Sequence, residues 1–174
     1  MNSTNCDHPI WDVYDQYRTA RLNVRYYEYK LEGLRRNNFR IELVLAISIS
    51  SGVAGLWFWE TVVGGIIWKI IVTLAAFTAV VKPLIKLSDR IQEQSVILAA
   101  WRELDDELQK LSILVRQCGK YNSELQNRFL SLMEKKSDIV KKETAEGIDR
   151  KLRQKCYEQV NLELPSDKFF VPGG

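Results

Sequence analysis

Histidine is almost absent from the sequence, because His8 is the only one. A serine–histidine–aspartate or cysteine–histidine set could therefore form only through a long-range contact to that single residue. The glycines form neither a phosphate-binding loop nor a dinucleotide fingerprint, and no CxxC pair occurs. The sequence therefore argues against an enzyme, and we expect no catalytic residue, no cofactor and no metal site.

Cysteine and net charge are also low. Cys6, Cys118 and Cys156 are odd in number and widely spaced, so neither a disulfide framework nor a metal site follows from them. We expect reduced thiols, as is usual in the cytoplasm. The net charge of +3 is too small to indicate direct binding of nucleic acid. The acidic cluster Glu103–Glu107 is interpreted as a solvated helix face.

Two long apolar runs stand between the polar parts of the chain. Leu43–Trp59 has 17 residues without a charge, and Ile70–Val81 has 12, extended on one side by Gly64–Trp68. A run of about 17–25 apolar residues can cross a hydrocarbon core of ~30 Å as a helix. The runs predict an all-α membrane protein with a two-helix transmembrane hairpin over residues 41–87. The alternative is a hairpin buried in a soluble helical bundle.

The flanks of the two runs differ in charge. Three tryptophans gather at the expected hairpin tip, namely Trp57, Trp59 and Trp68. Basic residues gather at the other end, namely Arg35, Arg36, Arg40, Lys82, Lys86 and Arg90. Because Lys and Arg stay on the cytoplasmic side, this pattern predicts that both termini lie in the cytoplasm. Glu60 and Lys69 would then face each other at the outer rim.

Small residues form a stripe within the first apolar run. Ser48, Ser51, Gly52 and Gly55 recur at i, i+3, i+4 and i+7, so they share one helix face. Such small residues let helix backbones approach closely in lipid. The stripe is expected either to pack the hairpin or to face a neighbouring subunit or an aqueous path.

The residues before the first run predict an amphipathic helix over residues 9–40. Its apolar positions are spaced by four and three: Val13, Tyr17, Ala20, Val24, Tyr27, Leu31 and Leu34. This face could pack on another helix of the protein or lie on a membrane surface. The narrow and continuous stripe favours packing.

The residues after the second run carry a heptad pattern from Ile97 to Ile139. Its leading positions form the expected oligomer or stalk face: Trp101, Leu104, Leu108, Leu111, Val115 and Asn122. The unbroken phase favours one coiled-coil-like helix over residues 88–146, and a helical hairpin bending near Gly119 is the alternative. We further expect a short amphipathic helix over residues 147–164 and a flexible tail over residues 165–174.

Taken together, Trp11–Leu34, Leu43–Leu87 and Ser88–Cys118 give a pattern that resembles the SLATT-domain family. These are small bacterial two-span proteins found with antiphage defence systems. The resemblance implies an oligomeric inner-membrane effector that forms pores or disrupts the membrane when triggered, causing abortive infection. It implies membrane lipids, further copies of the chain and an upstream sensor of a defence operon as partners. The alternative function is a non-conducting, membrane-anchored coiled-coil scaffold or a regulatory subunit.

Overall fold

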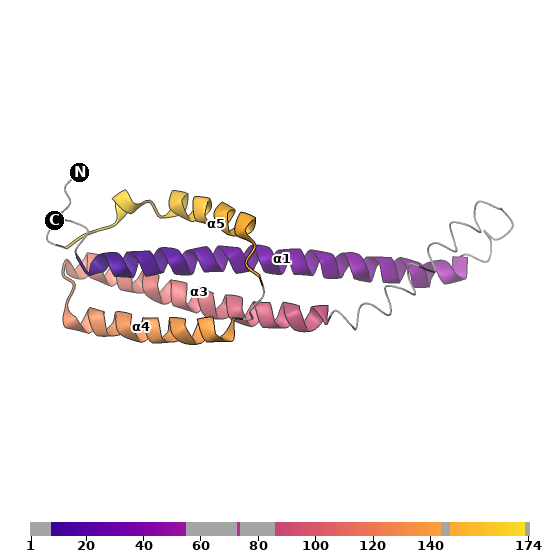
Figure 1. The fold of residues 1–174 in the computed structure, drawn as a ribbon, viewed down its shortest axis with the longest axis horizontal. Coiled ribbons are helices and arrows are strands. Elements are labelled where there is room, and N and C mark those ends of the chain that lie inside the picture. Colours follow the sequence, from indigo (N-terminus) through magenta and orange to yellow (C-terminus); the bar gives the residue numbers. More distant parts are fainter. Residues whose placement is uncertain (1–7, 55–72, 74–85, 144–146, 173–174) are drawn as a thin grey trace. The chain divides into compact units, whose positions relative to one another are not determined.

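The computed structural model describes residues 8–54, 73, 86–143 and 147–172. These residues are helical, with no strand among them (Figure 1). The elements are α1 (Ile10–Ala54), α3 (Leu87–Cys118), α4 (Ser123–Lys142), α5 (Arg150–Glu163) and the 3-10 turn η3 (Ser166–Lys168).

The chain divides into two compact units. The first combines Met1–Tyr29 with Gln94–Gly174, and the second is Lys30–Glu93. In the first unit, which we call the bundle, α3 runs antiparallel to the first part of α1, and α4 returns antiparallel to α3 (Figure 1). α5 lies along another side of α1 (Figure 1). α1 is therefore the central helix of the bundle, and the other three pack around it.

The apolar stripe at the start of α1 is buried. Val13 and Ala20 are fully inaccessible, and Tyr17, Val24 and Tyr27 are nearly so. The stripe therefore packs against other helices of the protein. This is the alternative that the sequence favoured over a position on a membrane surface. α1 is longer than the predicted helix, because it continues without a break to Ala54.

The heptad residues of α3 form the middle of the bundle core. Trp101, Leu104, Leu108, Leu111 and Val115 are each at most 2% exposed. α4 and α5 complete the core with Leu125, Phe129, Leu132, Ile139, Cys156 and Val160. Each large apolar side chain buried in this way contributes about 1.5–3 kcal/mol. The face is thus covered within one chain, and self-association of the folded protein would need other residues.

The single helix favoured over residues 88–146 is wrong. α3 ends at Cys118, and Gly119 has φ of 63°, a left-handed conformation that suits glycine at a helix end. Asn122 then caps α4, because its side-chain oxygen accepts a hydrogen bond of 3.0 Å from the backbone N–H of Leu125. The heptad phase survives because α3 and α4 each turn their apolar stripe toward the same core.

The expected transmembrane hairpin is not supported. No helix within the described ranges has both the length and the apolarity to cross a membrane. Of the first apolar run, Leu43–Ala54 is described, as the last part of α1. Residues 55–72 and 74–85 lie outside the described residues. The predicted inner-membrane location and topology are withdrawn with the hairpin.

The C-terminal residues are more ordered than expected. α5 begins after Asp149, whose side chain accepts hydrogen bonds from the N–H groups of Lys151 and Leu152 at 3.0 and 3.1 Å. The tail predicted to be flexible instead forms η3 and continues along α1 to residue 172. The prediction of a flexible segment is therefore wrong for residues 165–172.

Candidate functional site

A buried ion pair joins α1 to α3. Arg21 Nη2 lies 3.1 Å from Asp105 Oδ2, and it also lies 3.1 Å from the hydroxyl oxygen of Tyr17. The Arg21 guanidinium carbon stands 5.7 Å from the Tyr17 ring centroid, at cation–π distance. Asp105 is only 3% exposed, so the interpretation of Glu103–Glu107 as a solvated face fails at this residue.

The environment of Asp105 changes its acidity. Burial raises its pKa from 3.8 to about 6, although Arg21 acts in the opposite direction. Its Oδ1 atom has no hydrogen-bond partner among the described residues. Such a carboxyl group can exchange a proton near neutral pH. Because it faces Arg21 inside a helix interface, its direct effect is on helix packing.

Polar contacts also hold α5 on α1. Arg18 donates a hydrogen bond to Asn161 Oδ1, and Arg25 Nη2 lies 2.8 Å from Glu163 Oε1. These contacts fix the side of α1 that α5 covers. The neighbouring side of α1, between α5 and α4, is not covered by another described helix of the bundle.

The reactive side chains have structural surroundings. His8 Nδ1 accepts a hydrogen bond of 3.1 Å from the backbone N–H of Ile10 and so caps the start of α1. Cys156 is fully buried, and burial raises its pKa, so the thiol is protonated at neutral pH. Cys118 is exposed at the end of α3. Across residues 8–54, 86–143 and 147–172, no three His, Cys, Asp or Glu side chains are grouped to hold a metal ion.

The uncovered side of α1 is a groove between α4 and α5. Two cavities of about 320 and 240 Å³ adjoin at Thr19, which lines both. We call them together the α1 groove. Its floor consists of Asp15, Thr19, Leu22 and Tyr26, spaced by four, three and four residues on one helix face. Over these positions α1 rises ~16 Å, or about three turns.

Exposed apolar side chains stand at the walls of the α1 groove. Tyr157 of α5 is 50% exposed, Val140 of α4 is 48% exposed, and Ile148 just before α5 is 58% exposed. Single exposed apolar residues are common on protein surfaces. Three of them lining two adjoining cavities are typical of a binding surface instead.

The α1 groove is flanked by positive charge. Arg153 lines it, and Arg150, three residues earlier in α5, lies on the same helix face. Nearby carboxylates are already engaged: Asp149 caps α5, and Glu143 accepts a hydrogen bond of 2.8 Å from Trp101 Nε1. Within the described parts of the chain, Arg150, Lys151 and Arg153 form no ion pair. The cations therefore remain available to an anionic partner.

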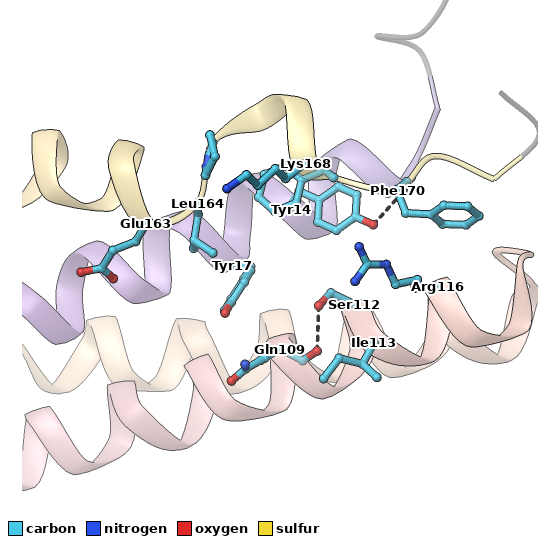
Figure 2. Close-up of a pocket in the computed structure, with 12 residues that line it drawn as sticks. Tyr14, Tyr17, Gln109, Ser112, Ile113, Arg116, Glu163, Leu164, Lys168 and Phe170 are labelled. Carbon is cyan, nitrogen blue, oxygen red and sulfur yellow. Dashed lines mark hydrogen bonds between the residues drawn. The ribbon is translucent and has the colours of Figure 1, made fainter.

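A second cavity, of about 300 Å³, lies under the C-terminal segment (Figure 2). Phe169 stacks on Tyr14 with ring centroids 4.2 Å apart, and the Tyr14 hydroxyl donates a hydrogen bond of 2.7 Å to the Phe170 carbonyl oxygen. Burial raises the pKa of Tyr14 despite the nearby charge of Arg116. The protein's own C-terminal segment thus covers one side of this cavity.

The remaining predicted site residues lie elsewhere. Ser48, Ser51 and Gly52 belong to α1, beyond the bundle. Gly55, Glu60 and Lys69 lie outside the described residues. Ser48, Ser51 and Gly52 are not among the residues that line the α1 groove.

Comparison with known proteins returns no relative. No family model matches the chain, and neither a curated protein nor a solved structure does. The resemblance to the SLATT-domain family consequently stays a prediction.

Sequence analysis missed the α1 groove. The floor residues are mixed in character, with an acid, a hydroxyl, a leucine and a tyrosine, so no apolar periodicity marks them. The basic run from Arg150 to Lys155 was a visible signal. Its relation to the groove became visible only in the tertiary structure, which places α5 beside α1.

Proposed function

We propose that this chain is a helical protein-interaction module without catalytic activity, and that its bundle presents the α1 groove to a partner. The observation that carries the proposal is the pair of adjoining cavities along α1 with Val140, Ile148 and Tyr157 exposed at their walls. A concave surface of this length with apolar anchors suits a helix-in-groove contact.

The bundle is built to hold this groove open. The Arg21–Asp105 pair ties α1 to α3, and the Arg25–Glu163 pair ties α5 to α1. On the other side, Lys136 Nζ of α4 donates a hydrogen bond of 2.6 Å to Gln16 Oε1 of α1. The floor and both walls are therefore connected by direct contacts, which favours a preformed binding surface over one that assembles on binding.

This proposal keeps the regulatory-subunit alternative and drops its membrane anchor. A role in antiphage defence, with an upstream sensor of the same operon as the partner, follows from the resemblance alone. It is proposed here only as one setting in which such a module would work. Pore formation is not carried forward.

Site-specific photocrosslinking tests the proposal. A benzophenone amino acid is placed at Ile148, beside the α1 groove, in cells that naturally carry the gene. The matched control carries it at Leu130, which is 53% exposed on α4 and lines neither cavity. We expect a discrete crosslinked protein at position 148 and none at position 130. Equal crosslinking at both positions, or none at either, would contradict a partner at this groove.

A further inference from the structure

We infer that the partner segment is an acidic amphipathic helix, which lays its apolar face on the floor of the α1 groove and its carboxylates against the cations of α5. This inference rests on the proposed function and names the chemistry of its partner. It commits to a partner protein and not to a second copy of this chain.

The dimensions of the groove favour a helix. The floor residues Asp15, Thr19, Leu22 and Tyr26 repeat at helical spacing, so the floor is a straight ridge-and-groove surface about three turns long. Residues of α5 line one of its two cavities and residues of α4 line the other. A partner helix packed on α1 in this position would be the fourth, after α3, α4 and α5.

Apolar anchors supply the affinity. Leu22 and Thr19 are half-buried on the floor, and Val140 and Tyr157 stand half-exposed on opposite walls. A partner helix with apolar residues at i, i+4 and i+7 would cover these side chains together. Burying them would gain free energy in proportion to the apolar area removed from water.

Charge supplies the orientation and selectivity. Arg150 and Arg153 share one face of α5 and carry no ion pair within the described residues, and Arg153 lines the groove. Of the groove residues, Asp15 carries the one exposed carboxylate on the floor, and Glu143 is bonded to Trp101. Carboxylates on the partner would meet these arginines and speed association, whereas a basic helix would be repelled.

The test uses a synthetic probe and the full-length protein. The probe is a fluorescein-labelled, helix-stapled peptide of about 16 residues with Leu at i, i+4, i+7 and i+11 and Glu on the flanking positions. Its control has every Glu replaced by Lys. Fluorescence anisotropy should show saturable binding of the acidic peptide, at least about tenfold tighter than the basic one and weaker as salt rises.

Two substitutions locate the binding. Arg153→Glu should weaken the acidic peptide about tenfold, and Val140→Ser should weaken it about fivefold. The matched controls are Lys120→Glu in the α3–α4 turn and Val96→Ser, which is 60% exposed on α3. Both controls should bind the peptide like the parent protein. Circular dichroism of each variant confirms that the helices are intact.

The outcomes distinguish the acidic-helix inference from the proposed interaction module. If the acidic and basic peptides bind equally, or if Arg153→Glu and Lys120→Glu behave alike, the acidic-helix inference is overturned. Crosslinking at Ile148 would then still support an interaction module with another kind of partner. If sedimentation shows that the crosslinked species is a dimer of this chain, a second copy occupies the groove and the inference is likewise overturned.

Discussion

Arg21 and Asp105 form an ion pair across the α1–α3 interface, with 3.1 Å between Nη2 and Oδ2 and with Asp105 only 3% exposed. The Arg21 side chain is 24% exposed, so the pair is desolvated mainly on its acidic side. This asymmetry explains why burial outweighs the attraction of Arg21 in setting the acidity of Asp105.

The stability of the bundle should depend on the protonation of Asp105. The pKa of Asp105 is about 6 in the folded protein, whereas its ordinary value is 3.8. Between these two pH values the folded state therefore binds more protons than the unfolded state. The free energy of unfolding contributed by this group is therefore greatest at low pH and falls as pH rises through about 6.

Asp105→Asn should remove this component. Urea unfolding followed from about pH 4 to about pH 7.5 should show the parent losing stability relative to the variant as pH rises, with the difference levelling off above the Asp105 pKa. Glu134→Gln, at an exposed position on α4, should keep the parental pH profile. An unchanged pH profile in Asp105→Asn would show that this carboxyl group does not titrate as the structure indicates.

The turn between α3 and α4 should need a glycine. Gly119 has φ of 63°, so Gly119→Ala should lower the free energy of unfolding by about 1–2 kcal/mol. Gly33→Ala is the matched comparison, because a Cβ there meets no atom within 4 Å in a helical segment. It should instead raise stability by about 0.5–1 kcal/mol. The same sign for both variants in chemical denaturation would refute the turn geometry.

The heptad face should act as an intramolecular core. Leu108 is fully buried, so Leu108→Ala should destabilise the protein by about 2–5 kcal/mol. Leu130→Ala, at a position 53% exposed on α4, should change stability by less than about 0.5 kcal/mol. Sedimentation velocity should give the parental mass for both variants. A loss of mass in Leu108→Ala without unfolding would restore the face to an oligomer interface.

The C-terminal segment should be held by Tyr14. Tyr14→Phe removes the hydrogen bond to the Phe170 carbonyl and should cost about 0.5–1.5 kcal/mol. Hydrogen exchange should then accelerate in residues 164–172. Tyr157→Phe removes a hydroxyl group with no partner in the described residues and should leave exchange in this segment unchanged. Equal exchange in Tyr14→Phe and the parent would mean that the tail is held by other contacts.

Two predictions failed for different physical reasons. The hairpin over residues 41–87 was inferred from the length and apolar content of two runs, whereas no helix in the described part of the chain is long and apolar enough to cross a membrane. The continuous helix over residues 88–146 was inferred from phase, yet two antiparallel helices sharing one core keep the same phase. Gly119 was the local signal of the turn, but the unbroken apolar period was given more weight than this one residue.

Local pattern alone determined the helical class, the buried stripe of α1 and the apolar positions of α3, because periodicity of 3.6 residues follows from neighbouring residues in the chain. It also predicted a last helix ending by residue 164, and α5 ends at Glu163. Only the tertiary structure decided that Asp105 is buried against Arg21, that the heptad face closes within one chain, and that α4 and α5 leave one side of α1 open. Each of these features depends on contacts between residues far apart in sequence, and the free energy of such contacts is set by how whole helices pack.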